Sequence, residues 1–262
     1  MQHKARKRFG QNFLHDQGVI QSIVNAIYPT KEDNLIEIGP GLGALTTQLL
    51  PLAGDMQVVE LDRDIIPHLE KICDGLGRLQ ITQADALKFD FSSLAQPDKK
   101  MRIVGNLPYN ISTPLLFHLM EYSEQIQDMH FMLQKEVVDR MSAVPGNKHY
   151  GRLSIMLQYF CQVDKLFDVP PEAFDPAPKV DSAIVRLTPY SELPIKVDDL
   201  KTYAMVVTKS FAHRRKTLRN NLKELLSSDE IEALGINPSA RAETLTQQAF
   251  ALLSNRVSSI KG

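Results

Sequence analysis

The residues Asn106-Leu107-Pro108-Tyr109 form the segment of this sequence whose types best suit a chemical task. An exocyclic amino group on a planar base is a poor nucleophile because its lone pair is delocalised into the ring. An Asn oxygen and a backbone carbonyl can each accept one N–H of such a group and draw the lone pair out of the plane. Pro108 holds the turn rigid, and Tyr109 offers a flat stacking face. The segment predicts a site that holds a planar amine for methylation, with a plain turn after a strand as the alternative.

Alternating strand-like and helix-like segments are expected to position this turn. Short β-branched or apolar runs predict strands at 35–38, 57–60, 79–82, 102–104, 130–133 and 183–187, and amphipathic runs predict helices at 42–52, 65–72 and 113–122. This alternation predicts an α/β fold with a mostly parallel sheet and helices on both faces. Ligands of such sheets bind beyond the carboxyl ends of the strands, which is where Asn106 is expected.

A glycine-rich loop, Glu37-Ile38-Gly39-Pro40-Gly41-Leu42-Gly43, follows the first expected strand. Glycines allow a tight turn and let a ligand approach the backbone closely. The spacing differs from the Gly-x-Gly-x-x-Gly of dinucleotide folds. Glu37 would repel a pyrophosphate but could help to position a cationic amino-acid group. A glycine turn without a ligand is the alternative.

Acidic residues end the next two expected strands. Glu60 is placed to accept two hydrogen bonds from a ribose diol, or it is an ordinary solvated acid. Asp85 could accept from an adenine amino group, or it could simply cap a helix that begins at Ala86 and Leu87. The order favours ligand binding, because the glycine loop, Glu60, Asp85 and Asn106 end successive strands whose ends line one crevice.

Length and composition limit the possible classes of protein. A chain of 262 residues with 43% hydrophobic residues and a net charge of −1 fits a soluble globular protein with a sizeable core. No apolar run approaches the ~18 residues of a membrane span, and the basic N-terminus lacks the apolar core of a secretory signal. Cys73 and Cys161 show no metal-binding or disulfide spacing. We therefore expect a cytoplasmic protein without a metal.

Positive charge gathers at the two ends of the chain. Residues 195–262 hold 11 Lys and Arg against 7 Asp and Glu, whereas the preceding 194 residues hold 19 against 24. The basic residues form an arm from Lys4 to Arg8 and a cluster of Arg214, Arg215, Lys216 and Arg219. Basic runs are usually solvated faces, but their position around an acidic middle predicts contacts with RNA phosphates.

A proline-containing stretch at 188–194 predicts a domain boundary. Residues 1–190 would form an N-terminal extension and a catalytic domain. Residues 195–262 would form a small all-helical domain that binds RNA or the ribosome, with helices at 200–211, 218–226, 229–234 and 245–254.

Four segments resemble the bacterial 16S ribosomal RNA adenine dimethyltransferase family of class I S-adenosylmethionine-dependent methyltransferases. They are residues 8–14 (RFGQNFL), 106–112 (NLPYNIS), 178–182 (PKVDS) and 211–221 (FAHRRKTLRNN). They occur in the family's order, and the resemblance covers essentially the whole chain. It implies a Rossmann-like fold, S-adenosyl-L-methionine as cofactor, and dimethylation of N6 of two adjacent adenosines. The implied substrate is the 3′-terminal hairpin loop of 16S rRNA in the 30S subunit or its precursor. A role in subunit biogenesis is also implied, and we expect a monomer.

The resemblance also implies roles for individual residues around the cofactor. Asn12 and Leu14 would close over it, and Gly39 would approach its methionine portion. Glu60 would hold the ribose hydroxyls, and Asp85 would accept from the adenine amino group.

The matching positions of the amine-binding turn receive roles in the same way. Asn106, next to the cofactor, would bind the target amine together with the backbone near Leu107 and Pro108. Tyr109 would stack on the target base. Phe174 would cover the other face of that base, or it would anchor its proline-rich loop in the core.

Three other functions remain open from the sequence. The related 23S rRNA adenine methyltransferases of macrolide resistance share the N-terminal Gln-Asn-Phe and the Asn-x-Pro-Tyr-type motif, but residues 214–221 (RRKTLRNN) favour the 16S enzyme. A DNA adenine methyltransferase fits less well because no sizeable target-recognition insertion is visible. An assembly factor of the small subunit, with incidental methylation, is compatible with the same sequence.

Overall fold

The computed structural model describes residues 12–261, which divide into two compact units. The first contains the described residues up to Val138 together with Val163–Pro189, and the second contains Asp139–Gln162 and the residues from Tyr190 onward. Among the described residues, no helix is long and apolar enough to cross a membrane, and no group of three or more His, Cys, Asp or Glu could hold a metal ion.

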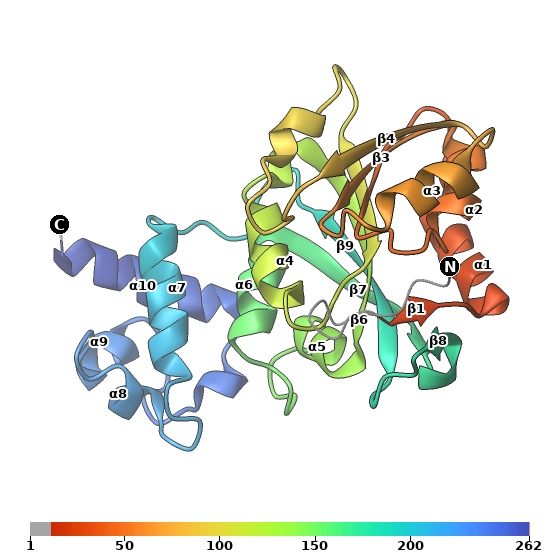
Figure 1. Ribbon diagram of the computed structural model, residues 1–262. Helices are drawn as coiled ribbons and strands as arrows, with labels where there is room; N and C mark the ends of the chain where they lie inside the picture. Colours follow the sequence, from red (N-terminus) through yellow and green to blue (C-terminus); the bar gives the residue numbers. More distant parts are fainter. Residues whose placement is uncertain (1–11, 262) are drawn as a thin grey trace. The chain divides into compact units, whose positions relative to one another are not determined.

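A seven-stranded sheet forms the centre of the first unit, in the order β4-β3-β2-β5-β6-β9-β7 (Figure 1). The pairings among β2 to β6 are parallel, and β9 runs antiparallel to β6. The strands are Asn34–Ile38 (β2), Asp55–Glu60 (β3), Arg78–Gln83 (β4), Met101–Asn106 (β5), Ile126–Gln134 (β6), Cys161–Val169 (β7) and Ser182–Pro189 (β9). The mostly parallel sheet is confirmed, and each of the six expected strands is present and longer than predicted.

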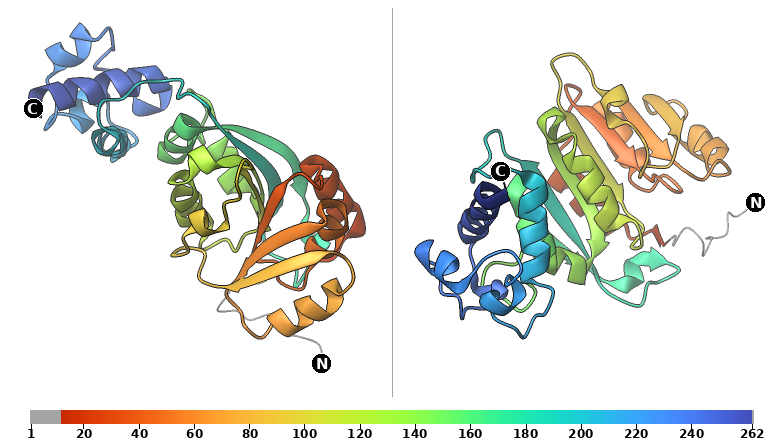
Figure 2. Two further views of the ribbon diagram at one scale, coloured as in Figure 1. Left: turned by 90° about the horizontal axis from the view of Figure 1, so that it is seen from above. Right: turned by 90° about the vertical axis from the view of Figure 1, so that its left-hand side faces the viewer.

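Helices cover both faces of the sheet (Figure 2). Helices α2 (Thr46–Ala53) and α3 (Ile66–Cys73) connect β2 to β3 and β3 to β4, and α4 (Ser112–Met120) connects β5 to β6. Parallel crossovers are right-handed, and the chain moves in opposite directions from β2 and from β5, so α4 lies on the other face from α2 and α3. The strand order therefore reverses between β2 and β5, and a crevice is expected at their carboxyl ends.

Two short strands and helix α1 complete the first unit. Phe13–Leu14 (β1) pairs antiparallel with Phe174–Asp175 (β8), and helix α1 (Gln17–Ile27) follows. Asp16 caps α1 by accepting from Val19 N at 2.9 Å. The buried face of α1 joins the core formed by α2, α3 and the sheet. The β1–β8 pair thus brings together segments about 160 residues apart in the sequence.

The second unit is helical. Its helices are α6 (Arg152–Phe160), α7 (Leu200–Ser210), α8 (Leu218–Asn221), α9 (Ser228–Ala233) and α10 (Gln247–Lys261), and α5 (Lys135–Met141) leads into it. Helix α8 is shorter than the predicted 218–226, and α10 is longer than the predicted 245–254.

Residues 139–162 group with the C-terminal helices, although the sequence placed them in the N-terminal domain. Aromatic packing gives the physical reason. The ring of Tyr150 lies 6.4 Å from that of Phe211, and the ring of Tyr159 lies 5.2 Å from that of Tyr203. The Tyr150 hydroxyl also donates to the carbonyl of Leu245 at 3.0 Å.

Candidate active site

A cavity of about 950 Å³ lies at the carboxyl ends of β2, β3 and β5, within the first unit. This is the point where the strand order reverses. The residues predicted to bind the cofactor and the target amine all line it: Asn12, Leu14, Gly39, Glu60, Asp85, Asn106, Leu107, Pro108 and Tyr109. The fold therefore gathers these side chains in one place, and their individual roles stay predictions.

The glycine loop after β2 keeps part of this cavity open. Gly39 and Gly43 have φ angles of 66° and 79°, in the left-handed region that favours glycine. A Cβ atom at Gly39 would meet no atom within 4 Å, whereas a Cβ at Gly43 would lie 2.6 Å from the Ile72 side chain. Gly39 thus leaves room for a ligand against the backbone, and Gly43 lets the start of α2 pack closely on α3.

Glu60 is held in a fixed orientation at the end of β3. The residue is only 6% exposed to solvent. One carboxylate oxygen accepts from Asp62 N at 2.7 Å, and the other accepts from Gly41 N at 3.3 Å. Burial raises the pKa of Glu60, and these backbone N–H groups act against the rise. Because each carboxylate oxygen has a further lone pair, the fixed group can still accept from the two hydroxyls of a vicinal diol.

Glu37 is a second buried carboxyl on the cavity wall. It is 2% exposed, and its Oε2 accepts from Thr46 Oγ1 at 2.6 Å. Burial raises the pKa of Glu37 to about 7, the Thr46 bond lowers it, and the nearby Glu60 carboxylate raises it further. A buried acid in this state suits a cationic partner, as the sequence suggested.

Asp85 precedes a turn rather than the helix that the capping alternative assumed, and it also faces the cavity. Its Oδ1 accepts from Leu87 N at 3.0 Å and so caps the turn beyond β4. The same residue lines the cavity. Capping and ligand binding are compatible, because the carboxylate has a second oxygen.

Asn106 ends β5 where that strand runs very close to β2. A Cβ atom at Gly105 would lie 2.5 Å from the carbonyl oxygen of Ile38, so glycine is needed for this approach. The Asn106 amide nitrogen donates to the backbone carbonyl of Asn12 at 3.2 Å. Its Oδ1 is therefore the side-chain atom that can accept from an incoming amine.

Contacts with β6 and β9, and one within the turn itself, hold the rest of the turn after Asn106. Leu107 N donates to the carbonyl of Met132 in β6 at 3.2 Å, and Pro108 closes the turn by accepting from Ile111 N at 3.1 Å. The Tyr109 hydroxyl lies 2.9 Å from Ser182 Oγ in β9. Burial raises the pKa of Tyr109, so the ring stays neutral near pH 7. The turn is consequently positioned before any ligand binds.

Phe174 does not lie in the cavity. It is 3% exposed, belongs to the same hydrophobic core as Leu14, and is absent from the described cavity lining. The reason is the β1–β8 pairing, which places Phe174 opposite Leu14 and buries both. This burial favours the alternative role, a core anchor for the proline-rich loop, and the role of Phe174 as a stacking partner stays a prediction.

Three neighbours of the site received no role from the sequence. The Phe13 ring would lie 3.5 Å from a Cβ atom at Gly41, Thr46 bonds to Glu37, and Ser182 bonds to Tyr109. Thr46 could have been noticed as the polar residue that opens the helix after the glycine loop. Ser182 could have been noticed because it ends the segment 178–182.

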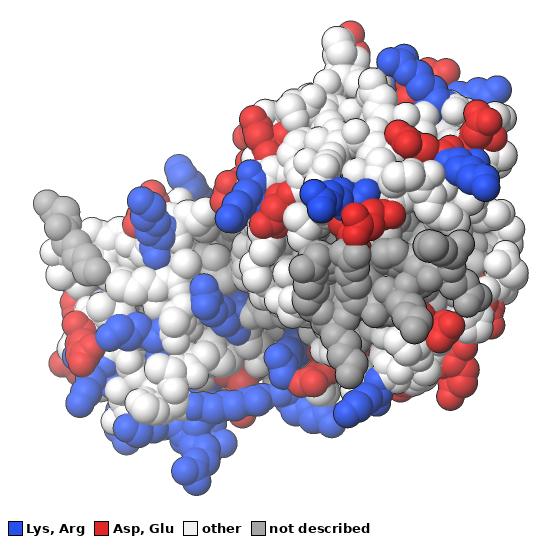
Figure 3. Space-filling view, viewed as in Figure 1, with Lys and Arg blue, Asp and Glu red and all other residues white. Residues whose placement is uncertain are grey.

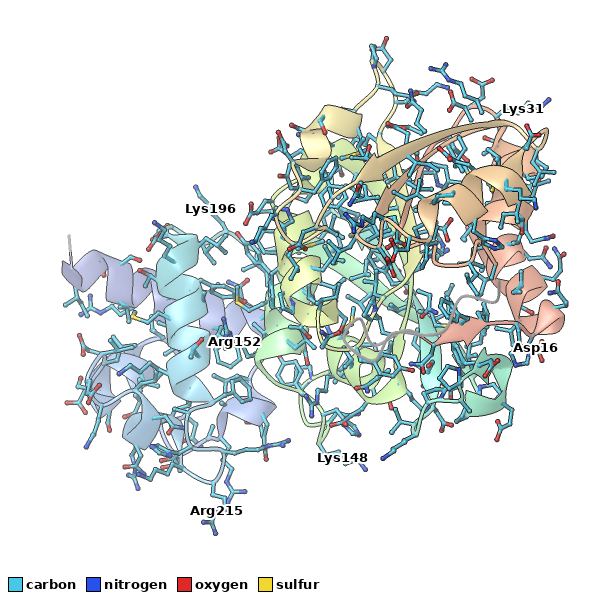
Figure 4. The ribbon with its side chains drawn as sticks, viewed as in Figure 1. Asp16, Lys31, Lys148, Arg152, Lys196 and Arg215 are labelled. Carbon is cyan, nitrogen blue, oxygen red and sulfur yellow. The ribbon has the colours of Figure 1, made fainter. Side chains whose placement is uncertain are left out.

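The second unit carries a separate basic hollow of about 370 Å³. It is lined by Gly146, Asn147, Lys148, Arg214, Arg215, Arg241 and Glu243. Arg214 donates to the carbonyl of Lys148 and lies 3.5 Å from a carboxylate oxygen of Glu243. Lys and Arg side chains gather along this part of the second unit in Figure 3, and Figure 4 shows Lys148 and Arg215 pointing outward from their loops. Lys216 and Arg219 are also exposed. The arm from Lys4 to Arg8 lies outside the described residues.

Sequence comparison identifies close relatives along almost the whole chain. The family model for ribosomal RNA adenine dimethylase matches residues 2–259. A protein of Saccharophagus degradans named ribosomal RNA small subunit methyltransferase A is 59% identical over 253 residues, covering 97% of this chain and 94% of that protein. A Pseudomonas aeruginosa protein of the same name is 56% identical over 262 residues, covering 100% and 97%.

Structural comparison confirms the class I methyltransferase fold. A dimethyladenosine transferase from Plasmodium falciparum is 28% identical with a TM-score of 0.79, covering 94% of this chain and 98% of that one. The 23S rRNA methyltransferase ErmE has the same fold, with 24% identity, a TM-score of 0.75, and coverage of 94% and 100%. The chain therefore belongs to the ribosomal RNA adenine dimethylase family.

Proposed function

We propose that this protein uses S-adenosyl-L-methionine to dimethylate N6 of two adjacent adenosines in the 3′-terminal hairpin loop of 16S rRNA. The family match and the names of its relatives support ribosomal RNA of the small subunit as the substrate. The observation that carries the proposal is the single cavity that joins the amine-binding turn to the diol-binding and adenine-binding acids.

The residues of the cavity fit this cofactor in their chemistry. Glu60 presents fixed oxygens for ribose hydroxyls, Asp85 offers an acceptor for an adenine amino group, and Gly39 leaves space against the backbone. S-adenosylmethionine supplies a methyl group on a sulfonium, which is a strong electrophile. The protein therefore needs mainly to position and desolvate the reacting groups.

The amine-binding turn would carry the chemical step. Asn106 Oδ1 and a backbone carbonyl near Leu107 accept the two N–H bonds of the adenine amine, so that the nitrogen lone pair points out of the ring plane. Tyr109 offers a stacking face for the base, worth ~1–3 kcal/mol, against the few kcal/mol that it costs to unstack a base. The nitrogen would attack the methyl carbon in line as the carbon–sulfur bond breaks, the sulfur would keep the electron pair and leave as S-adenosylhomocysteine, and the proton of the methylated amine would pass to water. This step needs no strong general base.

The second unit would supply much of the RNA affinity. Arg215, Lys216 and Arg219 are exposed, and Arg214 lines the same basic hollow as Lys148. Guanidinium and ammonium groups at such a surface bind phosphate oxygens and release counterions. We further propose the 30S subunit or its precursor as the partner, a monomeric and cytoplasmic enzyme, and a role in subunit biogenesis.

An Asn106→Ala variant tests the role of the turn. We expect methyl transfer to fall at least ~5-fold, because a lost hydrogen bond in a buried site costs ~1 kcal/mol or more. RNA binding should persist, since the exposed basic residues are untouched. Filter binding and methyl transfer should be measured on the same subunits.

Asn25→Ala is the matched control, because Asn25 is an exposed residue of α1 outside the cavity lining. It should retain both properties. Equal losses of RNA binding and methyl transfer in Asn106→Ala would show that Asn106 has a different role from the one assigned here.

A further inference from the structure

The hydroxyl of Tyr109 is held by Ser182, which lies 73 residues further along the chain. The two side-chain oxygens are 2.9 Å apart. Tyr109 lines the cavity, whereas Ser182 is 0% exposed and begins β9. Among residues 12–261, neither side chain has another hydrogen-bond partner. One bond therefore connects the ring that faces the cavity to the sheet.

Ser182 is a rigid support for that bond. It is paired in register with Gln134, the last residue of β6. The carbonyl of the preceding residue, Asp181, accepts from Lys135 N at 2.9 Å, and the following residue, Ala183, is buried in the core. The sheet thus sets the position of the serine hydroxyl before any ligand binds.

Tyr109 needs such a support, because the turn fixes only its backbone. Its carbonyl accepts from Ser112 Oγ at 3.2 Å, and the carbonyl of Pro108 accepts from Ile111 N at 3.1 Å. Neither bond involves the phenol ring, which without a further contact could swing about the Cα–Cβ bond between staggered rotamers. A hydrogen bond at the hydroxyl, the end of the ring farthest from the backbone, stops this swing.

The pair adds little to the stability of the fold. An Ala–Phe pair would occupy nearly the same space, and replacing both partners of a hydrogen bond by apolar groups is often close to neutral for stability. Ser182 is fully buried, so its hydroxyl gives up water on folding and gains only this one bond. The need to orient the ring of Tyr109 explains a polar pair at this point better than packing does.

We propose that Ser182 is a positioning residue: its hydroxyl anchors Tyr109 so that the ring stands in one orientation before the target base arrives. This inference rests on the proposed function, because it takes Tyr109 as the stacking face for the adenine. A base stacked on a fixed ring keeps its amino nitrogen in line with the methyl group, which is the condition for rapid displacement. A ring that swings would hold the base in a range of positions, of which only some are productive.

Loss of the anchor should act on the transfer step more than on binding. For Ser182→Ala we expect the single-turnover rate of methyl transfer to 30S subunits to fall about fivefold, the effect of one neutral hydrogen bond. The KM for subunits should be nearly unchanged, because the exposed basic residues of the second unit are untouched. A lower rate at constant KM marks an interaction that is made only in the reacting complex.

A double-mutant cycle shows whether Ser182 acts through the tyrosine hydroxyl. Tyr109→Phe keeps the ring and removes only that hydroxyl, so it should slow transfer as much as Ser182→Ala does. The double variant should be no slower than either single variant, because all three lose the same bond. Independent effects would instead multiply, to about 25-fold.

A rescue variant and a matched control complete the set. Ser182→Thr keeps the hydroxyl and should restore most of the rate. Ser210 in α7 is also 0% exposed, and its hydroxyl donates to the carbonyl of Val206 at 2.8 Å. Ser210→Ala therefore removes a buried serine hydrogen bond outside the cavity lining, and it should leave the transfer rate unchanged.

The outcomes separate this inference from the proposed function. An unchanged rate in both Ser182→Ala and Tyr109→Phe, with the unaltered protein active, would overturn the anchor and leave the methyltransferase assignment intact. A multiplicative loss in the double variant, or a loss seen only in KM, would do the same. No transfer by the unaltered protein would overturn both. If Ser182→Ala does not fold, Tyr109→Phe still decides the matter, because transfer at the full rate would overturn the anchor.

Discussion

Replacing Glu37 by Gln should make the folded protein, prepared without ligand, less sensitive to rising pH. Burial raises the pKa of Glu37 to about 7 in the folded chain, from an ordinary value of 4.5. The folded state therefore binds the proton more tightly than the unfolded state. A group with this sign contributes most stability below its unfolded pKa, and the contribution is lost as the pH rises through about 7.

The size of the effect follows from the difference between the two pKa values. Each unit corresponds to ~1.4 kcal/mol, so the full loss is about 3 kcal/mol. About 2 kcal/mol of it falls between about pH 5.5 and about pH 8.5. Gln keeps the shape of the side chain and can still accept from Thr46 Oγ1, but its NH₂ group needs a partner, which costs ~1–3 kcal/mol at every pH. The variant should therefore lose less stability than the unaltered protein over this range.

Urea denaturation followed by circular dichroism at several pH values measures the difference directly. The stability of Glu37→Gln relative to the unaltered protein should improve by about 2 kcal/mol over the range given above. Glu70→Gln, at an exposed position of α3, is the matched control and should show little change with pH. A difference that stays constant across the pH series would refute the protonated state of Glu37.

Two further predictions address the RNA contacts and the core. Arg214→Glu combined with Arg215→Glu should weaken subunit binding and reduce the slope of log K against log salt concentration by about 1. Two free phosphate contacts would give a larger reduction, but Arg214 is partly engaged by Glu243. The control variant, Lys31→Glu combined with Lys71→Glu, changes the net charge equally and should leave the slope unchanged. An unaltered slope in the arginine variant would show that Arg214 and Arg215 are only a solvated surface and do not contact phosphates. Phe174→Leu should lower the free energy of unfolding by about 1 kcal/mol, measured in thermal melts, because the ring is buried in the core. The variant should keep methyl transfer to 30S subunits. Loss of transfer without loss of stability would support a stacking role for Phe174.

The sequence predicted the sheet, and the grouping of the candidate site residues at one edge of it, where local pattern and strand order coincide. The glycine loop, Glu60, Asp85 and Asn106 each follow a recognisable strand, and a parallel sheet places such ends together. Helix α1 was not predicted, although its buried residues follow the 3.6-residue period and Asp16 caps it. That signal was available in the sequence.

Other features depend on pairings that no local pattern reveals. Strand β7 was not predicted, because Asp164, Lys165 and Asp168 interrupt its apolar pattern. Such a pattern is tolerated in β7 because this strand lies at the edge of the sheet. The burial of Phe174 follows from its pairing with Leu14, which is distant in the sequence. The grouping of residues 139–162 with the C-terminal helices likewise depends on tertiary packing.

The most direct test of the proposed function is transfer of tritiated methyl groups from S-adenosylmethionine to purified 30S subunits that lack the modification. Parallel reactions should contain 50S subunits and duplex DNA. We predict label only in 16S rRNA, recovered as N6,N6-dimethyladenosine at two adjacent positions. Label in 23S rRNA would contradict the assigned substrate, and subunit binding without any label would contradict the enzymatic function and favour an assembly factor.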